Sequence, residues 1–260
     1  MMGNYVDIHF EDKTAVLTIK NPPLNVLSKK VFQELGEAFE SLRTNDGVAA
    51  VLLTGSGDKA FVAGADIKEF PEMMSNPRMI EDVLATHEVL NSIDRFPKPT
   101  IAVLNGLTFG GGCELALACD IRIAEEHAQI GLPEVKLGLF PGGGGTQRLP
   151  RLIGEAKAKE LMYTGEPVSA QEAARIGLVN KVAASGEGMQ SARELAAKIA
   201  GHSLQALSRI KQAVDGGLDR TLEEGVKLEA RLFEEVFRTE DIKEGVKAFI
   251  EKRKAEFKHR

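Results

Sequence analysis

Apolar and polar positions alternate near the start of the chain, a pattern typical of β-strands. The alternation runs through residues 6–10, is interrupted by the polar residues 11–13, and gives way to an apolar run at residues 15–19. Two such runs around a short polar turn predict a β-hairpin. Residues 49–54 and 100–104 are further short apolar runs, and they predict buried strands.

Three segments in the first half of the chain predict helices. Behind Ser28, which can cap a helix N-terminus, apolar residues recur at helical spacing as far as Leu42. Residues 81–96 predict a second helix, which ends before Pro97 because a proline disfavours helical backbone in the residue preceding it. Residues 113–119 follow a glycine triplet and predict a short third helix.

The last third of the chain has a different pattern and is predicted to be almost entirely helical from about Met189 onward. Residues 169–172 and 221–224 have the spacing of capping boxes, which begin helices. The sequence therefore predicts an alternating α/β body followed by a helical C-terminal part, without an internal sequence repeat. An apolar stripe along the last predicted helix consists of Ile242, Val246, Phe249 and Ile250.

Charge and length exclude several classes of protein. The 260 residues carry a formal net charge of −5, which is the wrong sign for a general nucleic-acid binder because such proteins neutralise phosphates with Lys and Arg. No apolar run is long enough to span a bilayer, and the N-terminus lacks the basic and apolar regions of a signal peptide. We therefore expect a cytoplasmic protein that binds neither nucleic acid nor membrane.

The cysteines, histidines and glycines exclude several kinds of site. Cys113 and Cys119 lie together in an apolar segment, and their spacing fits neither a zinc site nor a disulfide framework. The five histidines are scattered, so no metal is expected. The glycine cluster at residues 142–145 does not complete a dinucleotide-binding fingerprint, because Gln147 occupies the position of the last glycine. Phosphate-binding loops and the Gly-x-Ser-x-Gly nucleophile motif do not occur in the sequence.

Three segments carry the candidate chemistry: residues 60–68, 105–115 and 132–148. In this order they resemble the crotonase (enoyl-CoA hydratase/isomerase) family, and the likeness covers essentially the whole chain. The resemblance implies an α/β fold, namely a crotonase-like spiral of ββα units with a C-terminal helical oligomerisation region. It implies a core with the active site in residues 1–200 and subunit packing through residues 201–260.

The glycine triplet at residues 110–112 precedes a predicted helix, and this arrangement is suited to binding an oxyanion. Glycine lets the backbone approach a ligand closely, and the first N–H groups of a helix have no intrahelical partner. A plain flexible turn is the alternative. The resemblance implies that the oxyanion hole consists of the backbone N–H groups of Ala65 and Gly111.

Two glutamates are the candidate acid/base pair. Glu114 stands in an otherwise apolar helix, where a carboxylate is rarely buried unless it is paired or functional, and a solvated face or a salt bridge is the alternative. Glu134 follows Pro133 in a loop-like segment, where an exposed, inert glutamate is common. Hydration of an enoyl thioester needs a base for water and an acid for C2, and two carboxylates can divide this work. The resemblance assigns the water to Glu114 and the C2 proton to Glu134.

The presence of both glutamates favours a hydratase among the activities of the family. The resemblance implies syn addition of water to trans-2-enoyl-CoA, giving 3-hydroxyacyl-CoA, as in fatty-acid β-oxidation. An enoyl-CoA isomerase, which can work with one carboxylate, and a methylglutaconyl-CoA hydratase are the alternatives on the same scaffold. An RNA-binding protein is the alternative from another class, because at least one hydratase-like branch has that activity, although the acidic net charge argues against it.

The implied partner is an acyl-CoA thioester substrate, and no separate cofactor is expected because coenzyme A is part of that substrate. The resemblance also implies a homotrimer or a homohexamer built as a dimer of trimers. Lys68 and Lys252 are candidates for contact with the 3′-phosphate, Lys252 from a neighbouring subunit, and solvated surface charge is the alternative for both. The residues implied in coenzyme A binding are Ala63, Ala65, Asp66, Ile67, Lys68 and Lys252.

Overall fold

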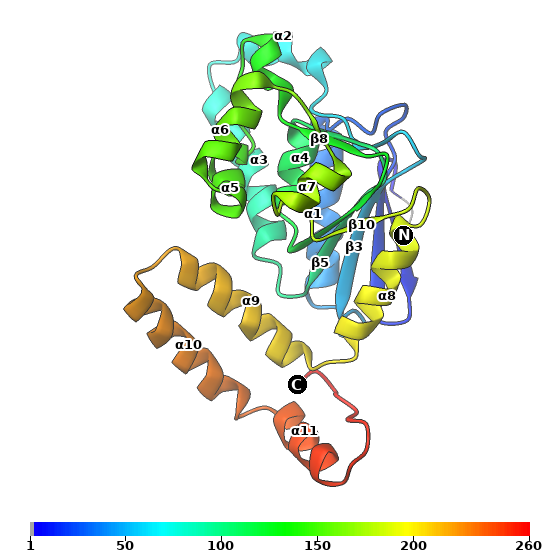
Figure 1. The fold of residues 1–260 in the computed structure, drawn as a ribbon, viewed down its shortest axis with the longest axis vertical. Coiled ribbons are helices and arrows are strands. Elements are labelled where there is room, and N and C mark those ends of the chain that lie inside the picture. The colour runs from blue at the N-terminus through cyan, green and yellow to red at the C-terminus, as the bar shows by residue number, and fades with distance from the viewer. Residues whose placement is uncertain (1–2) are drawn as a thin grey trace.

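The computed structural model describes residues 3–260, which form two β-sheets with surrounding helices (Figure 1). The larger sheet has six strands in the order β1-β2-β3-β5-β7-β10. β1 pairs antiparallel with β2, which confirms the predicted hairpin, and the other neighbouring strands pair in parallel. The strands of this sheet are β1 (Val6–Glu11), β2 (Thr14–Ile19), β3 (Ala50–Gly55), β5 (Thr100–Leu104), β7 (Ile121–Glu125) and β10 (Lys181–Ala183).

A smaller sheet contains four short strands in the order β4-β6-β8-β9. β4, β6 and β8 pair in parallel, and each follows closely on a strand of the larger sheet, namely β3, β5 and β7. Sequence analysis did not predict these strands, because two or three residues are too few to show an alternation of apolar and polar positions. The strands are β4 (Ala60–Val62), β6 (Leu107–Phe109), β8 (Gln129–Gly131) and β9 (Val168–Ser169).

Pairs of strands and helices follow one another as ββα units. β1 and β2 lead to α1, β3 and β4 lead to α2 and α3, β5 and β6 lead to α4, and β7 and β8 lead through a 3₁₀-helix to α5. The ββα unit is therefore repeated in the structure but not in the sequence, so the sequence could not predict the repeat. The helices of this body are α1 (Lys29–Arg43), α2 (Phe70–Met74), α3 (Met79–Asp94), α4 (Gly111–Leu117), α5 (Gly145–Ile153), α6 (Glu155–Thr164), α7 (Ala170–Arg175) and α8 (Gly188–Ala200), with the 3₁₀-helices η1 (Ile67–Glu69) and η2 (Pro133–Leu137).

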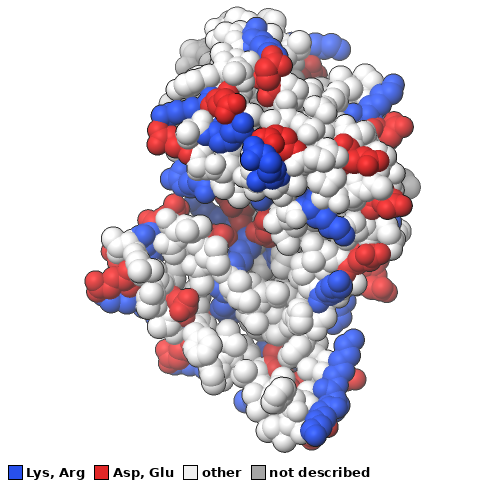
Figure 2. All heavy atoms as spheres, in the orientation of Figure 1, with Lys and Arg blue, Asp and Glu red and all other residues white. Residues whose placement is uncertain are grey.

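Three further helices, α9 (Leu204–Leu218), α10 (Leu222–Val236) and α11 (Glu240–Ile250), extend away from the body as an arm (Figure 1). The predicted helicity of the C-terminal part is confirmed as far as Ile250, whereas residues 251–260 are not helical. The space-filling view shows a hollow between the arm and the body, and Lys and Arg side chains intermingled with Asp and Glu over the visible face (Figure 2). The division into residues 1–200 and 201–260 stays a prediction.

Most of the apolar stripe predicted on the last helix does not pack inside the chain, and only Ile242 is partly buried. Val246, Phe249 and Ile250 are exposed, Phe249 to 85%. Asp241, on the same helix, is buried and accepts hydrogen bonds from the Ser203 hydroxyl at 2.6 Å and from the backbone N–H groups of residues 258 and 259, so the non-helical tail is fastened to the arm. Packing within the chain therefore does not account for the stripe.

Of the three helix N-caps that the sequence predicted, two are formed as expected and one is formed only in part. Ser28 accepts a hydrogen bond from the N–H of Val31, and the capping box of Thr221 and Glu224 is formed in both directions. Ser169 caps α7, but its expected partner Glu172 is bound by Arg175 at 2.6 Å, so the reciprocal half of that box is not made. The Glu172 carboxylate binds the neighbouring guanidinium instead of the backbone N–H of Ser169, because a hydrogen bond between two charged groups is the stronger one.

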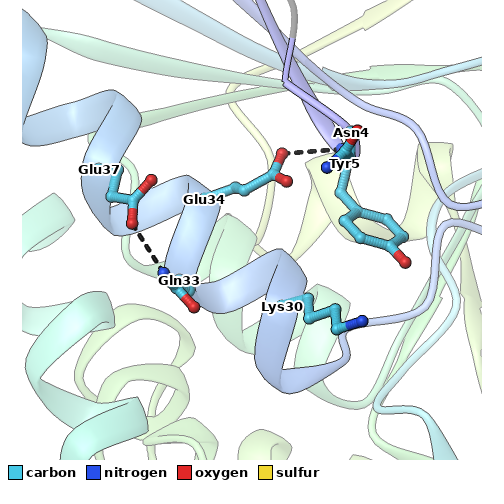
Figure 3. Close-up of a pocket in the computed structure, with 6 residues that line it drawn as sticks. All are labelled: Asn4, Tyr5, Lys30, Gln33, Glu34 and Glu37. Carbon is cyan, nitrogen blue, oxygen red and sulfur yellow. Dashed lines mark hydrogen bonds between the residues drawn. The ribbon is translucent and has the colours of Figure 1, made fainter.

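Helix α1 also holds the start of the chain in place (Figure 3). The carboxylate of Glu34 accepts hydrogen bonds from the backbone N–H groups of Tyr5 and Val6 at 2.8 and 2.9 Å. The opposite, apolar side of α1 is buried in the core, where the ring of Phe39 packs edge-on against that of Phe96 at 5.2 Å between centroids. One face of the helix thus fixes the first strand while the other anchors the core.

The bounds of two helices differ from the prediction. α3 spans Met79–Asp94 instead of residues 81–96, and it ends where Phe96 turns into the core. α4 starts at Gly111 instead of residue 113. Glycine has a low helix propensity, so the pattern of side chains could not locate a helical turn that begins with two glycines.

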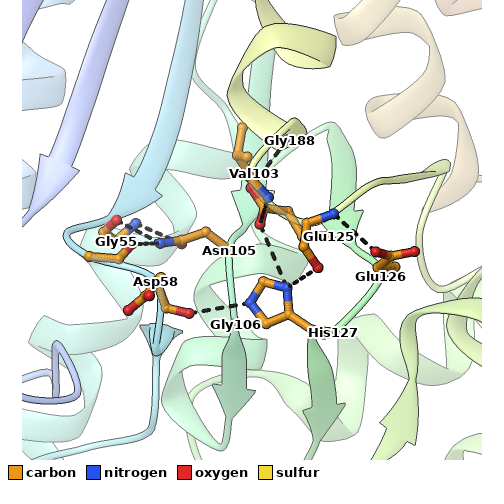
Figure 4. A network of polar contacts seen from close by, with 12 residues as sticks. Gly55, Asp58, Val103, Asn105, Gly106, Glu125, Glu126, His127 and Gly188 are labelled. Carbon is orange, nitrogen blue, oxygen red and sulfur yellow. Dashed lines mark hydrogen bonds and ion pairs between the residues drawn. The ribbon is translucent and has the colours of Figure 1, made fainter.

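The turns between the two sheets are held by buried polar side chains (Figure 4). Asn105, after β5, donates from its amide nitrogen to the carbonyl oxygens of Gly55 and Gly57 at 2.9 and 2.7 Å, and its amide oxygen accepts from the hydroxyl of Thr54 at 3.2 Å. Glu125, at the end of β7, accepts from the N–H of Gly188 at 3.1 Å. The bonds of Asn105 tie the turn after β5 to the turn after β3, and the bond of Glu125 ties the end of β7 to the start of α8.

Gly112 is a position where the packing of α4 against β4 requires glycine. A Cβ added there would overlap the carbonyl oxygen and Cβ of Val62. We expect Gly112→Ala to lower the free energy of unfolding by about 1–3 kcal/mol, the usual cost of overpacking, as measured by urea denaturation. Gly36→Ala in α1 is the matched control.

A Cβ at Gly36 would meet only ordinary contacts with Val89 at 3.6 Å. Alanine there should leave stability unchanged or raise it by about 0.5–1 kcal/mol, because alanine is the better helix former. Equal effects of the two substitutions would contradict the close contact at Gly112.

Candidate active site

Ala65 and Gly111 lie side by side although they are distant in the sequence. Ala65 follows β4 and forms an isolated parallel bridge with Leu27. Gly111 begins α4, which follows β6, and β4 and β6 are neighbours in the smaller sheet. A Cβ on Gly111 would lie 3.7 Å from the backbone nitrogen of Ala65. The sheet therefore brings together the two backbone positions that were predicted to act as a pair.

Both N–H groups lack an acceptor within residues 3–260. Gly111 is the first residue of its helix, so its N–H has no intrahelical acceptor. The bridge between Leu27 and Ala65 does not involve the N–H of Ala65. Its two hydrogen bonds run from the N–H of Leu27 to the carbonyl of Gly64 at 2.8 Å and from the N–H of Asp66 to the carbonyl of Leu27 at 2.9 Å. Two adjacent free donors, one of them at a helix N-terminus, form a place where a partly negative oxygen can bind.

Gly110 joins this pair of donors to the next ββα unit. Its φ of 53° is a conformation that residues with a Cβ rarely adopt, and its N–H donates to the carbonyl of Gly131 at 3.0 Å. A Cβ on Gly110 would lie 3.0 Å from Oε1 of Glu134. The carboxylate of Glu134 therefore lies directly against the backbone that precedes Gly111.

Glu114 lies one turn into α4 and is only 4% exposed. Its Oε1 accepts hydrogen bonds from the backbone N–H groups of Gly143 at 2.7 Å and Gly145 at 2.8 Å. No Lys, Arg or His among the described residues forms an ion pair with it. Both alternatives, a solvated helix face and a structural salt bridge, are thus wrong for this glutamate.

The surroundings of Glu114 act on its charge in opposite directions. Burial raises the pKa of this carboxyl above its ordinary value, because the interior disfavours the ionised form. The N–H groups of Gly145 and Gly143 oppose this effect, and so do the positive potentials of His87 and Arg148. Two donors and nearby positive potential therefore oppose the effect of burial, but burial is the larger effect and the pKa of Glu114 stays raised.

Glu134 lies in the 3₁₀-helix η2 instead of the predicted loop, and its environment differs from that of Glu114. It is half-buried, and its Oε2 has no hydrogen-bond partner. Burial raises the pKa of Glu134 to about 7, its own backbone N–H opposes the shift, and the negative charge of Glu114 adds to it. Near neutral pH this carboxyl is divided between its protonated and ionised forms, which suits a group that exchanges a proton.

Most of the remaining predicted binding residues form one exposed segment after β4. The N–H of Ala63 donates to the carbonyl of Leu24 at 3.0 Å, and Asp66 caps η1 by accepting from the N–H of Lys68 at 3.1 Å. Ile67 is 60% exposed. Lys252 is not part of this group, since it follows α11, and α11 and α2 lie at opposite ends of the molecule (Figure 1).

Sequence reasoning missed the groups that hold Glu114. It noted the glycine cluster at residues 142–145 but assigned no role to Gly143 and Gly145, and it counted His87 only among five scattered histidines. A buried carboxylate needs hydrogen-bond donors, and a glycine-rich turn at the start of a helix can supply them. This argument could have identified the two glycines from the sequence.

Exposed apolar side chains accompany the polar groups of the site. They lie on α2 and the start of α3, and on η2 and the loop that follows Glu134. Apolar surface next to a few convergent polar groups is typical of a binding site for a small molecule with an apolar part. These side chains are Met74, Met79, Ile80, Leu84, Val135, Leu137, Leu139 and Phe140.

Other hollows of the surface lie away from this site. One is lined by Asn4 and Tyr5 together with residues of α1 (Figure 3), and another by the β1–β2 turn, α8 and the C-terminal tail. No group of three or more His, Cys, Asp and Glu side chains in residues 3–260 is arranged to hold a metal ion. Over the same residues, no helix is both long and apolar enough to cross a membrane.

Comparison with known proteins identifies the family of the chain and agrees with its fold. The model of the enoyl-CoA hydratase/isomerase family matches residues 9–260. A short-chain-enoyl-CoA hydratase of Clostridium acetobutylicum is 44% identical over 99% of both chains, and a crotonyl-CoA hydratase of Syntrophomonas wolfei is 44% identical over 95% of both. The crystal structure of an enoyl-CoA hydratase from Geobacillus kaustophilus superposes with a TM-score of 0.96 at 38% identity, covering 100% of this chain and 98% of that one. The expected crotonase-like α/β fold is thereby confirmed.

The raised pKa of Glu134 has a consequence for stability. Its value of about 7 in the folded chain lies above the ordinary 4.5, so ionisation opposes folding as the pH rises between these values. Glutamine carries no charge, and we expect Glu134→Gln to stabilise the fold near pH 8 by about 1 kcal/mol, after allowance for solvent screening, and to have little effect near pH 4. Urea unfolding at the two pH values measures the difference.

The exposed Glu187, which precedes α8, provides the control for this prediction. Glu187→Gln should change stability equally at both pH values. A gain from Glu134→Gln that is the same at both would contradict the raised pKa.

Proposed function

The chain belongs to the enoyl-CoA hydratase/isomerase family, and on this premise we propose that it adds water to trans-2-enoyl-CoA thioesters. The product is a 3-hydroxyacyl-CoA. The observation that carries the proposal is the combination of the buried carboxyl of Glu114 and the half-buried carboxyl of Glu134 with the adjacent free N–H groups of Ala65 and Gly111. A donor pair binds the thioester oxygen, and two carboxyls next to it provide a base and an acid.

The backbone N–H groups of Ala65 and Gly111 receive the thioester carbonyl oxygen. Their hydrogen bonds draw electron density toward that oxygen, which makes C3 of the conjugated double bond susceptible to attack by water. Negative charge builds up on the oxygen as an enolate forms, and the N-terminus of α4 favours that charge. The loss of one donor of this kind typically costs about 2.7–4 kcal/mol of transition-state stabilisation.

The two carboxyls divide the proton transfers. Glu114 in its ionised form, which the N–H groups of Gly143 and Gly145 favour, accepts a proton from water while the hydroxyl bonds to C3. Glu134, whose pKa of about 7 leaves much of it protonated at neutral pH, gives its proton to C2. Exchange of one proton from Glu114 to Glu134 through solvent restores the starting state. Syn addition requires both carboxyls to act on the same face of the double bond.

Coenzyme A binding is assigned to the exposed segment after β4, which contains Ala63, Ala65, Asp66, Ile67 and Lys68. The exposure of this segment and its position next to the donor pair support that assignment. Lys252 belongs to the end of the chain far from α2, so its contact with the 3′-phosphate is made across a subunit boundary. No cofactor beyond the substrate's own coenzyme A is required.

We propose a homotrimer or a dimer of trimers as the functional assembly. The exposed apolar residues Val246, Phe249 and Ile250 on α11 support an assembly in which the arm packs against other copies of the chain. In such an assembly the arm of one subunit can bring Lys252 to the site of another. The reaction is a step of β-oxidation type, and we expect it to take place in the cytoplasm.

The alternative activities lack a specific observation in their favour. An enoyl-CoA isomerase can work with one carboxylate, whereas here a second one, Glu114, has its own pair of donors. Branched substrates such as methylglutaconyl-CoA call for the same two carboxyls. RNA binding calls for a basic surface, whereas Lys and Arg alternate with Asp and Glu on the face seen in Figure 2.

The carboxyl pair can be tested with crotonyl-CoA. We expect fast loss of the conjugated thioester absorbance with the wild type, and a fall in kcat of the order of 10²-fold or more in Glu114→Gln and in Glu134→Gln. Glu187→Gln, on the surface before α8, should turn over as the wild type does. A folded wild type without turnover on short, long and branched 2-enoyl substrates would overturn the proposal, and wild-type rates in either active-site variant would overturn the role of that residue.

The pH dependence of kcat/KM follows from the environments of the two carboxyls. Because Glu134 has to be protonated, we expect activity to fall as the pH rises through about 7. Because Glu114 has to be ionised and its pKa is raised, activity should also fall on the acidic side, above the range of an ordinary carboxyl. Stopped-flow hydration over a series of buffers measures both limbs, and a profile flat through pH 7 would argue against Glu134 as the acid.

A further inference from the structure

Arg148 occupies a position in the structure that the roles assigned so far do not use. It lies in the first turn of α5, and its side chain is only 16% exposed. Its guanidinium donates to Oδ2 of Asp94 from Nε at 3.0 Å and from Nη2 at 2.9 Å, and Nη2 also donates to Oδ1 of Asn91 at 2.8 Å. All three bonds connect α5 to α3.

The same guanidinium packs on the glycine turn that holds Glu114. The backbone N–H of Arg148 donates to the carbonyl of Gly144 at 2.8 Å, and a Cβ on Gly144 would overlap Nη1 of Arg148. Gly144 has a φ of 103° and stands between Gly143 and Gly145, whose N–H groups bind Glu114. Arg148 therefore contacts the turn from one side while the carboxylate binds it from the other.

This turn needs external support. Residues 142–145 are four successive glycines, and glycine gives the backbone the greatest conformational freedom. α5 has no side-chain cap at its N-terminus, and Pro150 inside the helix cannot donate a backbone hydrogen bond. Leu149 anchors α5 in the core, and the bonds of Arg148 to Asn91 and Asp94 are the polar contacts that tie the start of this helix, next to the glycine turn, to α3.

We propose that Arg148 is a positioning residue, which fastens the Gly143–Gly145 turn to α3 and thereby holds the carboxylate of Glu114 in its hydrogen-bonded orientation. The inference rests on the proposed function, in which Glu114 accepts a proton from water. Arg148 itself does not touch the substrate in this assignment. It acts through the two N–H groups and through its positive charge.

The groups that act on Glu114, directly or through Arg148, come from three elements. His87, Asn91 and Asp94 recur at helical spacing and lie along one side of α3, where Asn91 and Asp94 bind Arg148 and His87 adds positive potential toward Glu114. Arg148 faces it from α5 and Glu134 from η2. When Arg148 is removed, one cation and the fixed turn are lost together, so the pKa of Glu114 should rise.

The experiment compares Arg148→Gln with Arg151→Gln. Arg151 is on the same helix and is largely exposed. Its guanidinium donates to the carbonyl of Gln147 in its own helix at 2.9 Å and forms a long ion pair with Asp219 at 3.8 Å, and neither contact reaches α3, so its replacement should leave activity unchanged. We expect Arg148→Gln to lower kcat by about 10-fold to 10²-fold, with KM within about twofold of the wild type, because misplacement of a catalytic group affects the chemical step. The acidic limb of the pH profile should move to higher pH. Asn91→Ala should have a smaller effect of the same kind.

A double substitution separates a positioning role from a general loss of structure. If Arg148 acts through Glu114, then Arg148→Gln added to Glu114→Gln should lower the residual rate by less than about twofold. A multiplicative loss in the double variant, or a fall in kcat without movement of the acidic limb, would overturn the proposal. Thermal unfolding of each variant, with Arg148→Lys as the milder change, shows whether the protein remains folded.

A readout independent of turnover keeps this test distinct from that of the function. Infrared difference spectra follow protonation of Glu114 in the unliganded protein, and the band is identified by its loss in Glu114→Gln. Arg148→Gln should move that protonation to higher pH. An unchanged titration would overturn the positioning role even in an active enzyme, whereas a shifted titration in a protein that does not hydrate any 2-enoyl-CoA would support the role and refute the function.

Discussion

Burial of the Glu114 carboxylate is the constraint on which the rest of the site depends. A charge taken out of water is costly unless donors replace the water, and two backbone N–H groups do so at 2.7 and 2.8 Å. Those donors exist only because residues 142–145 can take up a turn that other residues would obstruct, as the overlap of a Cβ on Gly143 with the carboxylate indicates. The glycine turn leads directly into α5, whose residue Arg148 contacts α3. A single buried charge thus dictates the structure of a segment far from it in sequence.

The ββα architecture explains how the site comes together. Ala65 follows β4, Gly111 and Glu114 follow β6, and Glu134 follows β8, so three successive units each supply one part from the end of a strand in the smaller sheet. Parallel pairing of β4, β6 and β8 puts these strand ends next to one another. The polar side chains at the turns between the sheets, such as Asn105, keep each unit in the same orientation (Figure 4). Proximity in the site is therefore a product of the repeat.

The sequence predicted an element correctly where its pattern of apolar and polar residues extends over enough positions to be recognised. The hairpin and α1 were predicted correctly because alternation and helical spacing extend over several residues there, and Glu114 stood out as a charge among apolar neighbours. The strands of two or three residues and the 3₁₀-helix of Glu134 left no pattern long enough to detect. Gly143, Gly145 and Arg148 could not be assigned from sequence, because their roles lie in contacts between segments that only the folded chain brings together.

The contact between Gly112 and Val62 has a consequence for how such a protein can change over time. The spacing of the Ala65 and Gly111 N–H groups is set by backbone meeting backbone, at Gly112 against Val62 and at Leu27 beside Ala65. Side chains elsewhere can be exchanged without altering that spacing. The exposed apolar residues of α2 and α3 take no part in these contacts, so they can change while the two N–H groups keep their positions. Under the proposed function, mutations there alter the choice of acyl group and leave the donor pair intact.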